Sequence, residues 1–134
     1  MIPRDGVSRG VLRKVLMRFA AEGLARRQPG YGWHFVEALE TGEAVAESGQ
    51  FRMAVECAAL RQPGFRLDRE RLQQLRRAHE DILAAGETGT EAWFRVDTAF
   101  HETLAASSGD RFFLQAVQQQ NALCRMRDYG GLLR

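Results

Sequence analysis

Apolar side chains recur at helical spacing near the start of the chain and predict a helix there. Ser8 suits the N-cap, because its hydroxyl can accept a hydrogen bond from a free amide of the first turn, and Gly23 suits the end of the helix. The apolar side of this helix comprises Val11, Leu12, Val15, Leu16 and Phe19. The opposite side comprises Gly10, Arg13, Lys14, Met17 and Arg18. The helix is therefore predicted to pack on one side and to meet a partner on the other.

Two short extended segments follow, over about residues 24–27 and 33–36. The linking segment Gln-Pro-Gly-Tyr-Gly contains Gly30 and Gly32, and glycine favours the positive φ that tight turns require. A β-hairpin is therefore predicted over Leu24 to Val36. A helix that leads directly into such a hairpin is the order found in the winged-helix domains that bind DNA.

Four more helices are predicted in the rest of the chain, over about residues 42–62, 69–86, 90–108 and 111–129. Pro63 and Gly64 stop the first of them, Asp68 is placed as the N-cap of the second, and Gly109 separates the third from the fourth. No segment here alternates with period two. The predicted fold is mainly α: a partial winged helix over residues 1–38, followed by an antiparallel helical bundle over residues 39–134.

The charge distribution separates the two predicted parts. Residues 1–36 hold seven Lys or Arg and two Asp or Glu, for a net charge of +5, whereas the remainder holds twelve and fifteen, for a net charge of −3. A basic helix face is often merely solvated, and that alternative stays open on spacing alone. The concentration of cations in the first 36 residues nevertheless favours a partner rich in phosphate.

Composition limits the remaining classes of function. The 134 residues are 45% hydrophobic and 27% charged, which is enough for one core. No apolar run is long enough to span a membrane and no signal peptide precedes the first helix, so a cytoplasmic protein without a membrane partner is expected. Cys57 and Cys124 lack a CxxC partner and are expected to be reduced and structural. No phosphate-binding loop or dinucleotide motif is present, which argues against a nucleotide-using enzyme.

The third bundle helix carries the most suggestive polar pair. Asp97 and His101 lie one turn apart and fall within the apolar arc formed by Trp93, Phe94, Val96, Phe100 and Leu104. Polar groups removed from water need partners, so both side chains are predicted to point into a common internal space. They either satisfy each other and neighbouring helices or present a carboxylate oxygen and an imidazole nitrogen to one metal ion. Spacing and burial alone favour the first of these two interpretations, because such a pair on one helix is common.

The first 36 residues resemble the recognition helix and wing of GntR-type transcription regulators. The family pattern is close to V-S-R-T-P-V-R-E-A-L-x-x-L-x-x-E-G-L followed by a glycine-containing wing. The matching residues are Ser8, Arg9, Arg13, Leu16, Glu22, Gly23, Leu24 and Gly30. Gly10 and Val11 replace the usual Thr and Pro, and Lys14 replaces Glu. The resemblance implies DNA contacts from the helix and the wing, and the residues selected for them are Ser8, Arg9, Arg13, Lys14, Arg26 and Gly30.

Residues 37–134 resemble the FCD domain, the helical effector-binding domain of the FadR-like branch of that family. The resemblance rests on FRMAVECAAL and above all on VDTAFHETLAASSGDRFFLQAVQQQ. The D-x-x-x-H pattern of the family supplies an Asp and a His to a divalent metal (zinc, nickel or manganese), and Asp97 and His101 match it. Two further family histidines have no counterpart before Arg134, so weak metal binding or the metal-free state is expected.

Small organic acids are the effectors that the resemblance implies. Arg52 and Asn121 are the residues selected to bind them, with a surface ion pair and a core hydrogen bond as the respective alternatives. The chain appears truncated at both ends relative to a complete member of the family, since the two helices that precede a recognition helix are missing. A second copy of the chain is one candidate to cover the apolar side they would have contacted.

The predicted function is that of a non-enzymatic transcription regulator. In the implied mechanism, an acid bound at the metal alters the spacing of two DNA-binding heads in a homodimer on an operator. The alternative is a stand-alone helical module for ligand binding or dimerisation that no longer binds DNA. A metal-dependent hydrolase built on Asp97 and His101 is less favoured, because no nucleophile motif or third ligand is visible.

Overall fold

The computed structural model describes residues 6, 8–35 and 41–132, with side chains as far as residue 125. The elements in chain order are α1 (Arg9–Ala21), β1 (Ala25–Gln28), β2 (Gly32–Phe35), α2 (Gly42–Leu60), α3 (Arg69–Ala84), α4 (Glu91–Ala106) and α5 (Arg111–Leu132). The predicted mainly helical fold with one hairpin is confirmed, with element ends within three residues of expectation. The predicted end of the hairpin at Val36 and the boundary after residue 38 lie outside the described residues.

The side chains predicted to be N-caps, Ser8 and Asp68, cap their helices in the structure. The hydroxyl of Ser8 accepts a hydrogen bond from the amide of Val11 at 3.2 Å, and the carboxylate of Asp68 accepts one from the amide of Arg71 at 2.9 Å. Thr41 and Thr90 cap α2 and α4 in the same way. Each cap satisfies an amide that the helix itself leaves without a partner.

Glycines in the left-handed region end α1 and α3. At Gly23, with φ +74°, the amides of Gly23 and Leu24 donate to the carbonyls of Ala20 and Phe19, which is the Schellman arrangement. Gly86, with φ +70°, ends α3 in the same way, with open space where a Cβ would lie.

Two glycine substitutions should therefore act in opposite directions. Gly86→Ala is expected to lower the free energy of unfolding by about 1–2 kcal/mol, because an L side chain disfavours the left-handed region. Gly49→Ala in the middle of α2 should raise it by about 0.5–1 kcal/mol, since its Cβ would meet open space and helical glycine loses more backbone entropy than alanine. Urea unfolding measures both, and a stabilising Gly86→Ala would contradict the role of this cap.

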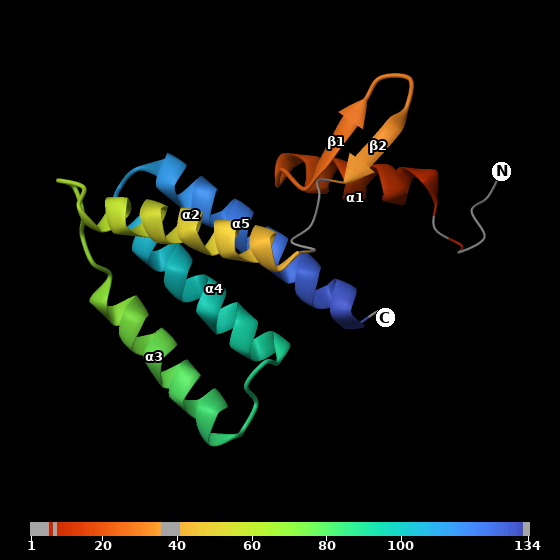
Figure 1. Cartoon of the computed structure of the whole chain (residues 1–134). Helices are drawn as coiled ribbons and strands as arrows, with labels where there is room; N and C mark the ends of the chain where they lie inside the picture. Colours follow the sequence, from red (N-terminus) through yellow and green to blue (C-terminus); the bar gives the residue numbers. More distant parts are fainter. Residues whose placement is uncertain (1–5, 7, 36–40, 133–134) are drawn as a thin grey trace.

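The bundle core is built where α2, α4 and α5 contact one another (Figure 1). Ala59 of α2, Ala105 of α4 and Val117 of α5 are fully buried, and the small alanine side chains allow close approach of the helix backbones. Helix α3 packs mainly on α4 and contributes the buried Leu75. Among the residues that the structure describes, no helix is both long enough and apolar enough to cross a membrane.

Residues 8–35, called the head below, pack against the bundle through one apolar cluster (Figure 1). Leu24 of the head lies against Ala122 and Leu123 of α5, and all three are buried. Around them pack the partly buried apolar side chains Phe19, Ala44, Val45 and Cys124. Strands β1 and β2 form an antiparallel pair, and Phe35 of β2 packs edge to face on Phe19 with ring centroids 6.0 Å apart.

The predicted packing of the apolar side of α1 is only partly correct. Leu16 and Phe19 are half-buried, whereas Val11, Leu12 and Val15 are exposed, and no residue of α1 is fully buried. The hairpin and α5 cover the end of the helix that carries Phe19, and no described element covers the rest of this side. Helical periodicity identifies an apolar side without specifying what packs on it.

Candidate functional site

A groove lies between α1 and the hairpin in the head. It has a volume of about 460 Å³ and is lined by Arg9, Leu12, Arg13, Leu16, Met17, Arg27 and Trp33. Three arginines and four apolar side chains thus line the same groove. We call this the arginine groove. Such a groove offers cations to a phosphate-bearing ligand while its apolar side chains contact the uncharged parts.

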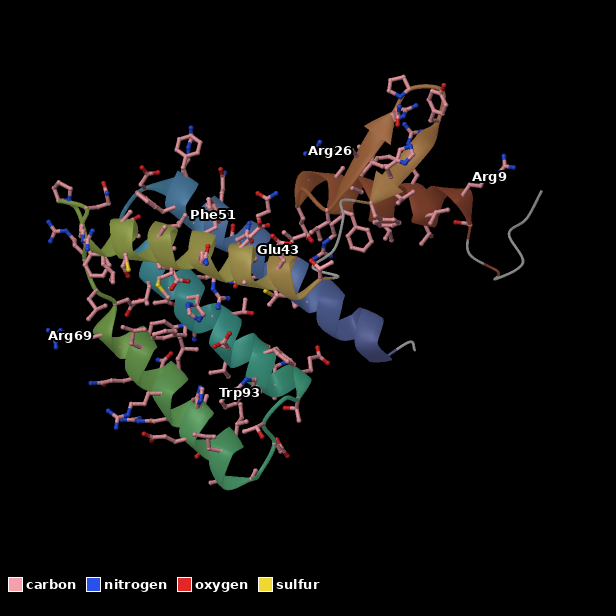
Figure 2. All side chains as sticks on the ribbon, viewed as in Figure 1. Arg9, Arg26, Glu43, Phe51, Arg69 and Trp93 are labelled. Carbon is pink, nitrogen blue, oxygen red and sulfur yellow. The ribbon has the colours of Figure 1, made fainter. Side chains whose placement is uncertain are left out.

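Strand register decides which wing arginine belongs to the groove. Arg27 pairs with Trp33 in the hairpin, and both line the groove, whereas the neighbouring pair Arg26 and His34 lies on the opposite face of the hairpin. Figure 2 shows Arg9 and Arg26 extending in opposite directions from the head. The structure therefore brings Arg9 and Arg13 together with Arg27, which was not selected from the sequence, and separates Arg26 from them.

The other residues selected for DNA contact lie at the edges of this region. Ser8 caps α1 and is exposed, so its hydroxyl accepts one backbone hydrogen bond and still has a proton to donate. Lys14 is exposed on α1, outside the groove. Gly30, with φ +83°, follows Pro29 in a turn closed by a hydrogen bond from the amide of Tyr31 to the carbonyl of Gln28. Proline followed by a positive-φ glycine is typical of a type II turn.

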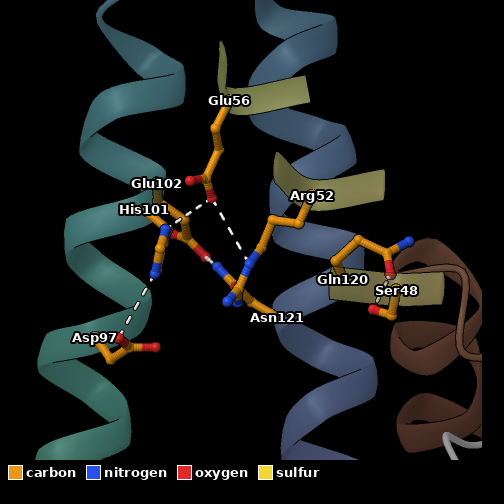
Figure 3. Close-up of polar contacts among 8 residues, drawn as sticks. All are labelled: Ser48, Arg52, Glu56, Asp97, His101, Glu102, Gln120 and Asn121. Carbon is orange, nitrogen blue, oxygen red and sulfur yellow. Dashed lines mark hydrogen bonds and ion pairs between the residues drawn. The ribbon is translucent and has the colours of Figure 1, made fainter. Parts of the chain in front are cut away.

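Asp97 and His101 meet on α4 as their spacing predicts. Asp97 Oδ1 lies 3.6 Å from His101 Nε2 (Figure 3). Both side chains line one pocket, as predicted, but the side chain of His101 is 18% exposed and that of Asp97 is 42% exposed, so the carboxylate is only partly removed from solvent. This pocket has a volume of about 560 Å³, is open to solvent and lies between α3 and α4.

The other nitrogen of the imidazole meets an acidic residue from α2. His101 Nδ1 lies 2.7 Å from Glu56 Oε1 (Figure 3), and both atoms are removed from solvent. The N–H is not well aligned with the oxygen, so the contact is an ion pair rather than a well-formed hydrogen bond. Neither atom has another hydrogen-bond partner among the described residues. The imidazole is thus held between two carboxylates from two helices.

Arg52 and Asn121, selected separately as effector-binding residues, contact each other. Arg52 Nη1 donates to Asn121 Oδ1 at 3.3 Å, and Asn121 Nδ2 donates to Glu102 Oε1 at 3.3 Å. Arg52 Nε also lies 3.8 Å from Glu56 Oε1. Asn121 is only 2% exposed, so its amide connects α2, α4 and α5 inside the bundle. We call Asp97, His101, Glu56, Arg52, Asn121 and Glu102 the polar cluster (Figure 3).

Protonation in the cluster favours a charged pair. The pKa of His101 is raised to about 9, first by Asp97 and then by Glu56, because both carboxylates stabilise the imidazolium while burial opposes it. The pKa of the Asp97 carboxyl is lowered mainly by His101, again against the effect of burial. In the metal-free protein the imidazole is therefore cationic at neutral pH.

This raised pKa predicts how stability changes with pH. A folded-state pKa of about 9 exceeds the unfolded value of about 6.5, so the stabilisation is complete below about pH 6.5 and is lost as pH rises towards 9. The loss should be on the order of 2 kcal/mol. Urea unfolding in the presence of a chelator measures it, and His101→Gln should remove the loss while His34→Gln in the exposed hairpin should not. An unchanged pH profile in His101→Gln would contradict the assignment.

The polar cluster provides part of a metal site. Two donors each about 2.1 Å from a tetrahedral ion are about 3.4 Å apart, close to the separation of Asp97 Oδ1 and His101 Nε2. Among the described side chains, no group of three or more His, Cys, Asp or Glu is arranged to hold an ion. His79 lines the same α3–α4 pocket, where its ring lies 4.2 Å from the Trp93 ring. Asp97 and His101 could therefore supply two of the ligands of a metal ion.

Both cysteines are free, as expected, but Cys57 is exposed on α2 and has no packing role there. Three functional candidates were missed in the sequence: Arg27, Glu56 and Glu102. Arg27 could have been selected from the alternation of a strand if the register had been known. Glu56 lies far from His101 in the sequence, and its helix has no clear polar side that would have identified an inward-facing acid.

The chain was compared with protein families, curated proteins and solved structures. Residues 47–132 match the FCD domain. No curated protein matches the chain. A solved structure from Listeria monocytogenes, of Lar, which is described as controlling the expression of the agr system, is 20% identical with a TM-score of 0.71, over 89% of this chain and 56% of that one.

A second solved structure, from Rhodococcus sp. RHA1 and described as a transcriptional regulator GntR, is 20% identical with a TM-score of 0.59, over 87% of this chain and 56% of that one. At 20% identity this similarity shows only that the fold is shared, and it extends over both the head and the bundle. The chain spans a little over half the length of both structures.

Proposed function

The chain belongs to the FCD domain family, and on that premise we propose that it is part of a ligand-responsive transcription regulator that binds DNA through its head. The observation that carries the proposal is the joining of an FCD bundle, in one chain, to a helix and hairpin with an arginine groove between them. The predicted domain over residues 1–38, which contains the head, is proposed to read DNA, and the predicted domain over residues 39–134, which contains the bundle, is proposed to sense a small carboxylate. No catalytic step is assigned to any residue.

The charge and shape of the head support DNA as its partner. Arg9, Arg13 and Arg27 line the arginine groove, and Ser8 offers a hydroxyl proton at the start of the same helix. Guanidinium groups bind phosphate oxygens in pairs, and cations placed along one groove displace counterions from the DNA backbone. In this proposal α1 lies in the major groove, and the wing, with Gly30 at its tip, contacts the adjacent backbone.

A divalent ion at Asp97 and His101 is the proposed sensor in the bundle. The 3.6 Å separation of their donor atoms and the Glu56 carboxylate behind the imidazole support this assignment. When bound, the ion would supply positive charge to attract a carboxylate ligand. Two protein donors predict weak binding of zinc, nickel or manganese unless other groups complete the shell.

Arg52 is the proposed anchor for the acid, because its guanidinium lies near both the Asp97–His101 pair and Asn121. Its present partners, Glu56 and Asn121, would have to share it with the ligand. Asn121 also neighbours Ala122 and Leu123, on which Leu24 of the head packs. A change at Arg52 would thus reach the contact between bundle and head, and in a homodimer it would alter the spacing of two heads.

Binding to DNA at several salt concentrations tests the proposal. The whole chain is titrated onto the duplex found upstream of its own coding frame and onto an unrelated duplex of equal length. A regulator should prefer the first, and its affinity should fall steeply between about 50 and about 200 mM salt, as expected when several phosphates are neutralised. Equal, weak and salt-insensitive binding to both duplexes would contradict DNA recognition by this chain.

One observation favours the alternative of a helical module that does not bind DNA. The apolar side chains Val11, Leu12 and Val15 of α1 are exposed, so in the described part of the chain the helix lacks the packing that would fix its orientation on DNA. A module of this kind should bind metal or acid ligands in the same way with α1 and the hairpin removed, and should not bind either duplex.

A further inference from the structure

We propose that Glu56 is a positioning residue for the metal site, which fixes the ring orientation and the protonated nitrogen of His101 so that Nε2 is presented to the ion. The inference rests on the metal site assigned to Asp97 and His101 under the proposed function. It concerns a residue on a different helix that the D-x-x-x-H spacing does not include.

The contact geometry gives the two carboxylates separate tasks. Glu56 Oε1 lies 2.7 Å from Nδ1, and Asp97 Oδ1 lies 3.6 Å from Nε2. The two carboxylates therefore contact different nitrogens of the His101 ring. A carboxylate close to Nδ1 keeps a proton on that nitrogen, so Nε2 is the nitrogen that would give up its proton when a metal binds. Asp97 is at the separation expected of a second donor to the same ion, whereas Glu56 faces the wrong nitrogen to be one.

Burial makes this contact specific to Glu56. The side chains of Glu56 and His101 are 15% and 18% exposed, and the two contacting atoms are removed from solvent. Neither atom has another hydrogen-bond partner among the described residues, so no other described side chain takes the place of Glu56 at this nitrogen.

The rest of the polar cluster holds Glu56 in place. Arg52 Nε lies 3.8 Å from the same oxygen, Oε1, that contacts His101. Arg52 in turn donates to Asn121, which is buried on α5 and donates to Glu102 of α4. Through Arg52 and Asn121 the Glu56 carboxylate is thus connected to α5 and α4. Partners of this kind around a ligating histidine change metal affinity by about 10–100-fold when they are removed.

The test compares Glu56→Gln with Glu47→Gln, which removes the same charge from an exposed position on the same helix. Zinc and nickel ions are the probes, and their affinity for the full chain is measured by competition with a chromophoric chelator. Glu56→Gln should bind both ions about 10–100-fold more weakly than the wild type, whereas Glu47→Gln should bind like the wild type. Thermal unfolding monitored by circular dichroism establishes that each variant is folded.

A spectroscopic measurement distinguishes positioning from a general structural effect. Nitrogen-15 NMR of the His101 ring under saturating zinc should show the proton on Nδ1 and the metal on Nε2 in the wild type, and a mixture of the two arrangements in Glu56→Gln. If Glu56→Gln does not fold, Glu56→Asp keeps the charge at a shorter reach and should show an intermediate loss of affinity.

The positioning role of Glu56 and the metal site itself would be contradicted by different results. Equal zinc affinity of Glu56→Gln and Glu47→Gln, or an unmixed NMR signature in a folded Glu56 variant, overturns the positioning role and leaves the metal site standing. A wild type that binds zinc no more tightly than His101→Ala overturns the metal site of the proposed function, and the positioning role with it.

Discussion

Replacing Leu24 by alanine is expected to lower the free energy of unfolding by about 2–4 kcal/mol and to loosen the head from the bundle. Leu24 is 3% exposed and packs on Ala122 and Leu123 of α5, so its removal leaves a cavity at the main contact between the two parts. Urea unfolding measures the loss. Hydrogen exchange of the β1 and β2 amides should become faster in the same variant, because the hairpin is held to the bundle through this contact.

Leu83→Ala is the matched control, because it makes the same chemical change at a side chain that is half exposed on α3. Its cost should stay below about 1 kcal/mol, and exchange in the hairpin should be unchanged. If both variants lost the same stability, or if the hairpin amides exchanged at the wild-type rate in Leu24→Ala, the cluster around Leu24 would not be what holds the head.

The second large effect is expected on DNA. Changing Arg13 and Arg27 together to alanine should weaken duplex binding by about 10–100-fold at moderate salt and reduce the slope of log affinity against log salt by about two. The reason is that both guanidinium groups line the arginine groove and each is proposed to neutralise one phosphate. Fluorescence anisotropy with a labelled duplex at several salt concentrations gives both quantities.

Arg26 supplies the internal comparison, since it is adjacent to Arg27 but lies on the opposite face of the hairpin. Arg26→Ala should change affinity and salt dependence less than Arg27→Ala. A larger loss from Arg26→Ala would mean that the outer face of the hairpin, with His34, meets the DNA. In that case the arginine groove would not be the DNA-binding surface.

Local signals in the sequence predicted the elements of the fold because their causes are local. Ser8 and Asp68 cap helices through amides three residues away, and Gly23 and Gly86 end helices through bonds that span five residues. The FCD resemblance over the bundle is likewise confirmed, by the match over residues 47–132. The caps and the helix ends depend on residues that are close together in the sequence.

The polar cluster was predicted only in part, because most of its contacts cross between helices. Asp97 and His101 share one helix, so their proximity followed from spacing. The contact of Glu56 with His101 requires α2 to face α4, and no periodicity in either helix specifies that. The partial exposure of Asp97 could not be predicted for a related reason. An apolar arc on a helix does not show how much of that arc a neighbouring helix covers.

The limited contact between head and bundle affects how the whole chain responds to heat. Helix α1 has no fully buried residue, and the head is held mainly by the cluster around Leu24. Elements with few buried contacts open with a smaller free energy than the core. Local opening of the head should therefore begin at a lower temperature than melting of the bundle, which contains four of the five helices in the described part of the chain.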